Sequence, residues 1–340
     1  MERKIKALAA REPRGKLEPF DFNAGELRPE QVEIKVSHCG ICHSDLSMRD
    51  NKWQMTVYPF VPGHEAVGEI VAIGDRVKHL KIGDKVGLGW FSESDMSCAQ
   101  CLSGNQNLCE QAEQTIVGRP GAFAERVRCH WSWAFRLPDA LDASKAGPLF
   151  CGGITVFNPI VQFDVRATDK VGVIGIGGLG HLALQFLNKW GCEVTAFTSS
   201  ARKADEVRQM GAHFVVNSKS DSELESVAGK FDFIISTVNA DLNWLAFLNT
   251  LAPKGRLHFV GVVPGPLSLP AFPLIAGQKS VSGTPAGGPA TLAKMLEFCA
   301  RHSIAPVTET FKMSEANEAF KHLEAGKARY RIVLENDIGV

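Results

Sequence analysis

The sequence has no long apolar run. None of its segments approaches the roughly 20 consecutive apolar residues that a membrane-spanning helix needs. The N-terminal segment, Met-Glu-Arg-Lys-Ile-Lys, has no apolar core like that of a secretory signal peptide. Charge of one sign is not in excess either, because 37 basic residues balance 37 acidic ones. We therefore expect no nucleic-acid or membrane partner and a cytoplasmic location.

Internal repeats, low-complexity segments and long linkers are also absent. A chain of 340 residues usually exceeds one hydrophobic core, so we expect two domains. Residues 1–150 are predicted to be mostly β, because short alternating or apolar runs are separated by glycine and proline. The predicted strands of this part are 32–36, 66–73 and 80–88, the last with a Gly-Asp turn inside it.

From residue 151 to 299 the character changes, and strands alternate with helices. This βαβ rhythm predicts an α/β domain with a doubly wound parallel sheet. The predicted strands are 171–174, 193–197, 214–216, 231–235 and 256–260, and the predicted helices are 179–190, 203–210 and 242–251. A helix at 314–324 and a strand at 331–334 break the rhythm, so we expect residues 300–340 to complete the first domain.

Nine cysteines in a reducing compartment favour metal binding or catalysis over disulfides. Cys42, His64 and Cys151 supply two thiolates and an imidazole, and a catalytic zinc takes three such ligands and keeps one position open. No spacing rule links the three, so a buried cysteine or a core histidine is the alternative for each. Four cysteines without a partner spacing are expected to be small buried side chains: Cys39, Cys129, Cys192 and Cys299.

A second cysteine group lies in a polar loop. Cys98 and Cys101 are separated by two residues, and Cys109 follows after seven more. Two close cysteines followed by a third are a strong metal signal in a reduced protein.

A glycine-rich turn follows the strand at 171–174. Gly175, Gly177 and Gly180 form the G-x-G-x-x-G pattern, with Gly178 and Leu179 inside it, and an apolar helix begins there. This context predicts dinucleotide binding, with the pyrophosphate at the turn. The acidic residue that binds an NAD ribose is missing from the end of the next strand. Hydroxyls and cations that suit a 2′-phosphate stand there instead, which predicts NADP(H): Ser199, Ser200, Arg202 and Lys203.

On these motifs, from Cys39-Gly-Ile-Cys-His-Ser-Asp45 to Tyr330-Arg-Ile-Val333, the chain resembles the zinc-dependent medium-chain alcohol dehydrogenases. It is most similar to their cinnamyl-alcohol-dehydrogenase branch and its bacterial NADPH-dependent aldehyde reductases. The resemblance implies a GroES-like catalytic domain and a Rossmann domain. It also implies that Cys42, His64 and Cys151 bind the catalytic zinc, that Glu65 can exchange onto the metal, and that Asp45 orients His64.

The resemblance assigns a structural zinc to the second cysteine group, with one departure. Relatives usually have a fourth cysteine three positions before Cys98, where this chain has Asp95. We favour a site of three cysteines and Asp95. A three-thiolate site completed by water, or a loop without metal, remains an alternative.

Further roles follow from the resemblance. Ser44 is expected to begin a proton relay, and it could be a helix N-cap as well. Ser47 occupies the position of the histidine that ends this relay in many relatives, and His43 should lie near the cofactor pyrophosphate. The expected cofactor contacts are Thr155, Thr237, Val238, Asn239, Val260 and Arg331. Trp53 and Trp90 could form an apolar wall above the zinc, with ordinary packing as the alternative.

These expectations combine into one function. We expect a zinc-dependent, NADP(H)-linked reductase of medium-chain or aromatic aldehydes, and a homodimer formed near Lys279–Gly283. A polyol or sugar dehydrogenase on the same fold is the close alternative. A metal-free quinone or enoyl reductase would lack the three zinc ligands together. A zinc-stabilised redox-sensing protein would leave the glycine turn without a purpose.

Overall fold

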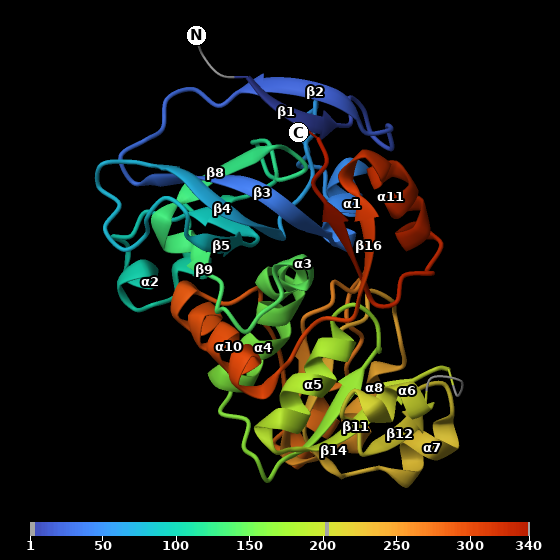
Figure 1. Ribbon diagram of the computed structural model, residues 1–340. Helices are drawn as coiled ribbons and strands as arrows, with labels where there is room; N and C mark the ends of the chain where they lie inside the picture. Colours follow the sequence, from blue (N-terminus) through green and yellow to red (C-terminus); the bar gives the residue numbers. More distant parts are fainter. Residues whose placement is uncertain (1–3, 201–203, 339–340) are drawn as a thin grey trace. The chain divides into compact units, whose positions relative to one another are not determined.

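The computed structural model describes residues 4–200 and 204–338, and Figure 1 shows its helices and strands. The chain divides into two units, which we call unit 1 (residues 1–152 and 288–340) and unit 2 (residues 153–287). The end of the chain, residues 288–340, lies in the same unit as residues 1–152. The boundary differs from our expectation, because helix α10 (Pro289–His302) belongs to unit 1. No helix was predicted here, and an amphipathic pattern would not by itself tell which sheet the apolar face of the helix covers.

Unit 1 is built on a seven-stranded sheet. Its strand order is β16-β17-β3-β4-β5-β9, with β8 paired to β3 off this path. All pairs are antiparallel except β16 with β17. The strands are β3 (Gln31–Ile41), β4 (Ala66–Ile73), β5 (Lys85–Leu88), β8 (Arg126–His130), β9 (Phe135–Arg136), β16 (Thr308–Lys312) and β17 (Arg331–Glu335). Only the second half of the predicted strand 80–88 forms, because Gly83 adopts a φ of +91° in the turn before β5.

Strand β3 is the centre of this sheet and follows its sequence pattern. Val32, Ile34 and Val36 are buried, as period-2 alternation requires of a strand with one face on the core. Two small two-stranded sheets complete the β structure: β1 (Lys4–Ala9) with β2 (Glu18–Asn23), and β6 (Phe91–Glu93) with β7 (Glu113–Gln114). The helices of unit 1 are α1 (His43–Arg49), α2 (Ala99–Leu102), α3 (Ala143–Ala146), α10 and α11 (Ala316–Glu324). The 3₁₀ turns are η1 (Gln106–Leu108), η2 (Trp131–Trp133), η3 (Gly147–Phe150) and η5 (Met313–Glu315).

Unit 2 contains the predicted parallel sheet. Its six strands have the order β12-β11-β10-β13-β14-β15, and every neighbouring pair is parallel. This is the doubly wound strand order of a Rossmann domain. The chain first adds strands on one side of β10 and then, from β13 on, adds them on the other side. The strands are β10 (Lys170–Ile174), β11 (Glu193–Thr198), β12 (Phe214–Asn217), β13 (Phe231–Ser236), β14 (Leu251–Phe259) and β15 (Ser280–Gly283).

Helices connect these strands, and their apolar faces form the core of unit 2. They are α4 (Gly152–Gln162), α5 (Gly180–Trp190), α6 (Ala204–Gln209), α7 (Asp221–Ser226), α8 (Trp244–Thr250) and α9 (Ala271–Gly277). Helix α5 ends where Gly191 takes a φ of +106°, a conformation that glycine adopts without strain. The helices α4, α7, α9 and α10 and the strand β15 were not predicted from the sequence. Within residues 4–200 and 204–338, the helices are too short or too polar to cross a membrane.

Candidate active site

Helix α1 positions the first residues of the site. Cys42 is its N-cap, and the Asp45 carboxylate accepts a hydrogen bond from the Cys42 backbone N–H at 2.9 Å. Cys42 rather than Ser44 therefore caps the helix, and Ser44 lies in the first turn. The cap fixes the point at which β3 turns into α1, which aims the Cys42 thiol into the interior of unit 1, where it is 6% exposed.

Asp45 also holds His64. The Asp45 Oδ1 atom lies 3.0 Å from His64 Nδ1 and accepts a hydrogen bond from the Gly63 N–H at 2.8 Å. Gly63 has a φ of +99°, and a Cβ there would lie 2.6 Å from a ring carbon of Phe123. Only glycine fits this turn, and the result is an imidazole whose Nε2 atom is left to face the two thiols.

Cys151 completes the group, which the fold assembles from three distant segments. Its Sγ atom lies 3.3 Å from His64 Nε2 and 3.9 Å from Cys42 Sγ. The Cys151 thiol donates to Cys42, which lowers the pKa of Cys42 well below its ordinary value and raises the pKa of Cys151. Burial by itself lowers the pKa of His64, but the Asp45 carboxylate and the Cys42 thiol raise it above its ordinary value. A buried thiolate beside an imidazole is the donor chemistry of a zinc site.

Glu65 brings a carboxylate to the same place. Ligand atoms of Cys42, His64, Glu65 and Cys151 all lie within 4.8 Å of one another. Burial raises the pKa of Glu65, and its Oε1 atom is paired with the buried Arg331. The buried Oε2 atom has no hydrogen-bond partner among the described residues. A buried carboxylate oxygen without a hydrogen-bond partner fits a side chain that can become a metal ligand.

The structure adds two residues to this group that the sequence analysis did not place in it. Arg331, expected at the cofactor pyrophosphate, lies on β17 and contacts Glu65. That contact was invisible in the sequence, since 266 positions separate the two residues. Gly40 was not predicted at all, yet a Cβ there would lie 2.0 Å from Glu65 Oε2. The glycine before Ile41 and Cys42 therefore makes room for the carboxylate.

Three of the predicted polar and aromatic residues lie beside this group. The Ser44 hydroxyl lies 3.6 Å from Cys42 Sγ. Trp90 meets the His64 ring edge-on at 5.0 Å between centroids, and Trp53 meets Trp90 at 6.1 Å. Trp53 is 36% exposed, so the two indoles form a wall that reaches from the buried histidine to solvent. His43 and Ser47 also lie on α1, but among the described residues neither side chain hydrogen-bonds to a ligand atom of this group.

The second cysteine group is brought together with Asp95. Ligand atoms of Asp95, Cys98, Cys101 and Cys109 lie within 4.8 Å of one another. Asp95 Oδ1 accepts hydrogen bonds from the N–H groups of Cys98 and Ser97, which lower the pKa of Asp95. Cys98 is the N-cap of the short helix α2, and its sulfur accepts a hydrogen bond from the Cys101 N–H at 3.4 Å. The loop thus presents three sulfurs and one carboxylate to a common point.

In unit 2, the glycine turn leaves the carboxyl end of β10. Gly175 has a φ of +85°, and a Cβ on Gly180 would lie 1.9 Å from the Gly175 carbonyl oxygen. A Cβ on Gly177 would meet nothing within 4 Å. The fold therefore requires glycine at 180 but not at 177. An open position with glycine fits the close approach of a pyrophosphate to the backbone.

Other predicted cofactor residues gather at the same edge of the sheet. The Thr237 hydroxyl, after β13, donates to the carbonyls of Ile174 and Gly175 at 3.1 and 2.7 Å, and Val238 packs on Gly175. Asn239 follows on the same loop, and Val260 follows β14, where its N–H bonds to the Ser236 carbonyl at 3.0 Å. Ser199 and Ser200 follow β11, while Arg202 and Lys203 lie outside the described residues. Thr155 lies on α4 and Leu179 caps α5.

Two family models match the chain. An alcohol dehydrogenase GroES-like domain matches residues 28–139, and a zinc-binding dehydrogenase domain matches residues 178–301. Aldehyde reductase AdhA of Synechocystis is 56% identical over 98% of this chain and 99% of that protein. The chain belongs to the zinc-binding alcohol dehydrogenase family. It is an oxidoreductase, and the resemblance seen in the sequence is confirmed.

Solved structures agree with this assignment. A cinnamyl alcohol dehydrogenase of Sorghum bicolor superposes with a TM-score of 0.94 at 35% identity, covering 98% of both chains. A cinnamyl alcohol dehydrogenase of Helicobacter pylori, solved in complex with NADP(H), gives a TM-score of 0.91 at 29% identity and covers 98% of this chain and 99% of that one. The predicted fold class, a GroES-like domain with a Rossmann domain, is confirmed.

Proposed function

We propose that this member of the family reduces medium-chain or aromatic aldehydes to primary alcohols with NADPH. The observation that carries the proposal is the buried group of Cys42, His64 and Cys151, next to a Glu65 oxygen without a partner. The 56% identical relative bears the name aldehyde reductase. A polyol substrate would call for a more polar surround than the two indoles beside His64.

The donor set fits zinc, since two thiols and an imidazole are the ligands this metal prefers and three of them leave one position open. Cys42, His64 and Cys151 would hold the ion, and Glu65 could take a place on it. When bound, zinc supplies Lewis acidity at a carbonyl oxygen, and the nicotinamide supplies the hydride. Asp45 keeps the His64 ring oriented through its Nδ1 atom. Glu65 is itself held by Arg331.

Ser44 is the residue we assign to proton transfer. Its hydroxyl is 3.6 Å from the Cys42 sulfur and half-buried. Its place beside the ligand group and its partial exposure would suit it to give a proton to the oxygen of the product and to recover one from solvent. Ser47 stands where relatives end their relay in histidine, so the far end of the path differs here. Trp53 and Trp90 would contact the apolar part of the substrate and exclude water.

We propose NADP(H) as the cofactor because no described residue at the end of β11 supplies the carboxylate that an NAD ribose needs. Ser199 is exposed and Ser200 is half-buried there, and Arg202 and Lys203 follow. The remaining contacts stay predictions: Thr155, Thr237, Val238, Asn239 and Val260 toward the nicotinamide and adenosine, and His43 and Arg331 toward the pyrophosphate. We also propose the cytoplasm as the compartment, since all nine cysteines are free and reduced thiols persist there.

An activity panel tests this proposal. Purified protein would be assayed for oxidation of NADPH and NADH with benzaldehyde, cinnamaldehyde and straight-chain aldehydes, and for reduction of NADP⁺ with mannitol. We expect aldehyde turnover with NADPH favoured by about tenfold or more, since charge-assisted contacts to a 2′-phosphate supply at least about 1.4 kcal/mol. Cys42→Ala should abolish turnover. Cys129→Ala, a buried cysteine outside both groups, should keep it. Turnover with mannitol alone would favour the polyol dehydrogenase, and no turnover would favour the redox sensor.

For the second group, we propose a structural zinc held by Asp95, Cys98, Cys101 and Cys109. Two observations support this proposal. The ligand atoms of the four residues lie within 4.8 Å of one another, and two backbone N–H groups hold the Asp95 carboxylate in place. Metal analysis should give about two zinc ions per chain, falling to about one in Asp95→Ala. Asp95→Cys should restore the second ion, and Asp139→Ala, an exposed carboxylate elsewhere, should not change it. A full zinc content in Asp95→Ala would assign the fourth position to water.

We propose a homodimer through the free edge of β15. This strand ends the sheet of unit 2, and three large apolar side chains near it in sequence are exposed: Val262 at 67%, Phe272 at 76% and Ile275 at 72%. A sheet edge beside exposed apolar side chains invites pairing with a second copy of the chain.

A further inference from the structure

A cavity of about 390 Å³ opens on unit 1 and has no apolar side chain in its lining. Three segments form it: the loop at 14–16, the end of α1 with the turn after it, and α11. None of its residues belongs to the two cysteine groups. Its volume lies in the range of small-molecule sites, roughly 300–1,000 Å³. All its lining side chains are polar or charged, which does not match the apolar aldehydes proposed as substrates, so a different kind of ligand must be considered.

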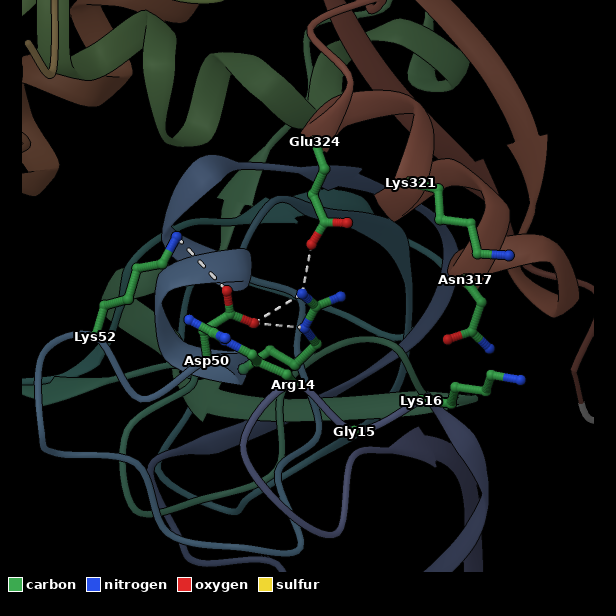
Figure 2. Close-up of a pocket in the computed structure, with 9 residues that line it drawn as sticks. Arg14, Gly15, Lys16, Asp50, Lys52, Asn317, Lys321 and Glu324 are labelled. Carbon is green, nitrogen blue, oxygen red and sulfur yellow. Dashed lines mark hydrogen bonds and ion pairs between the residues drawn. The ribbon is translucent and has the colours of Figure 1, made fainter.

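Positive charge dominates the lining. Two carboxylates, Asp50 and Glu324, stand against five basic side chains, which leaves three positive charges in excess. The basic side chains are Arg14, Lys16, Arg49, Lys52 and Lys321. Figure 2 shows Asp50 and Glu324 directed toward one guanidinium, while Lys16 and Lys321 stand at the right of the view with Asn317 between them.

The two carboxylates are already used within the protein. Arg49 lies at the floor with its side chain 11% exposed, and its guanidinium pairs with Asp50 at 2.7 Å and with Glu324. Lys52 also reaches Asp50, at 3.5 Å. Arg14 and Lys16, in contrast, have no ion-pair partner in the part of the chain that the structure describes. The excess charge is therefore located at the mouth of the cavity.

The loop that carries these two cations is held in place. The Asn317 side chain bonds to both the N–H and the carbonyl of Leu17 at 2.9 Å, which ties the loop to α11. The Arg14 N–H donates to the Arg49 carbonyl at 3.3 Å, which ties it to α1. Because the backbone is fixed on both sides, less ordering is needed when a ligand binds.

We propose that this cavity binds a small molecule carrying a phosphate group, with Arg14 and Lys16 as the principal contacts. Phosphate concentrates negative charge on several oxygens, which suits a guanidinium fork and an ammonium group together. Lys52 and Lys321 stand on the other walls but are paired with Asp50 and Glu318, so Arg14 and Lys16 carry the attraction. The inference concerns unit 1 alone and does not depend on the proposed aldehyde reduction.

Calorimetry on the zinc-loaded protein tests the proposal. Saturating NADPH would be present, so that the dinucleotide phosphate site is filled before titration. The titrants are inorganic phosphate, glycerol 3-phosphate and, as the uncharged control, glycerol. The test variant is Arg14→Gln with Lys16→Gln. Its matched control is Arg76→Gln with Lys78→Gln, an exposed pair with the same spacing and the same change of charge.

We expect both phosphates to bind the wild type and the control variant, with affinity about tenfold weaker or lost in the Arg14/Lys16 variant. Hydrogen exchange should show protection at residues 12–17 when ligand is bound. Tighter binding of glycerol 3-phosphate than of phosphate would identify an organic phosphate, and equal binding would identify the free ion. No saturable binding of either, or equal affinities in the two variants, would overturn the proposal.

Discussion

At the scale of the residue, Asp45 organises the candidate active site. One carboxylate accepts hydrogen bonds from the Cys42 N–H and the Gly63 N–H and meets the His64 ring nitrogen. These contacts fix a helix cap, a turn and a ligand at once. An arrangement in which one side chain holds two ligand-bearing segments makes the metal group sensitive to a change of a single atom.

We predict that Asp45→Asn weakens zinc binding at this group by about tenfold to a hundredfold, because an amide cannot serve all three neighbours as an acceptor. Zinc competition with a chromogenic chelator would measure it. Asp84→Asn, which affects an exposed ion pair with Arg136, serves as the control. An unchanged zinc affinity in Asp45→Asn would show that His64 is oriented by its packing alone.

At the scale of the element, the turn between β10 and α5 separates two uses of glycine. A Cβ at Gly180 would overlap the Gly175 carbonyl oxygen at 1.9 Å, whereas a Cβ at Gly177 would meet no protein atom within 4 Å. The first glycine serves the fold, and the second is free to serve a ligand.

We therefore predict that alanine at these two positions affects different properties of the protein. Gly180→Ala should lower the free energy of unfolding by about 1–3 kcal/mol, since the turn must shift. Gly177→Ala should change it by less than about 1 kcal/mol but weaken NADPH binding by about tenfold or more. Urea unfolding and fluorescence titration with NADPH would separate the two. Equal loss of stability in both variants would contradict the assignment.

The pairing of β3 with β8 contains a second element-scale feature. Glu33 accepts hydrogen bonds from Arg126 at 2.6 Å and Arg128 at 2.8 Å across the strands. Burial by itself raises the pKa of Glu33, but the two guanidinium groups outweigh it and bring the pKa below the ordinary value of 4.5. A carboxylate with a lowered pKa stabilises the fold above its unfolded-state pKa and loses that contribution as the pH falls through the folded-state pKa.

We predict that Glu33→Gln lowers the free energy of unfolding by about 1–2 kcal/mol at pH 7. The difference from wild type should shrink as the pH falls below 4.5, because the wild-type carboxyl then becomes protonated. Urea unfolding across this pH range would measure it. Glu30→Gln, at an exposed pair with Arg76, should show no such dependence, and a constant difference in Glu33→Gln would refute the role of charge.

At the scale of the whole molecule, the proposed homodimer rests on the free edge of β15. Light scattering after size exclusion should give twice the 36.9 kDa mass of the chain for the wild type. Ile275→Lys should shift the protein toward the monomer, since the charge would be buried in the interface. Ile82→Lys, an equally exposed apolar residue of unit 1 at 61%, should leave the dimer intact. A monomeric wild type would contradict the proposed homodimer.

The sequence alone determined the features that depend on short stretches of chain. The turn Gly175–Gly180 with its flanking strand and helix, the β3 and β4 strands, and the spacing of Cys98, Cys101 and Cys109 are local, because backbone conformation and side-chain period act over a few residues. Family resemblance then supplied the link between Cys42, His64 and Cys151, which no spacing rule could supply.

Only the tertiary structure decided what depends on distant contacts. It paired Arg331 with Glu65, placed Gly40 against that carboxylate, and gave α10 to unit 1. It also built the basic cavity from three segments that lie far apart in the chain. Burial, ion pairing and free space arise from the packing of whole elements, and a linear pattern records the elements but not which of their faces meet.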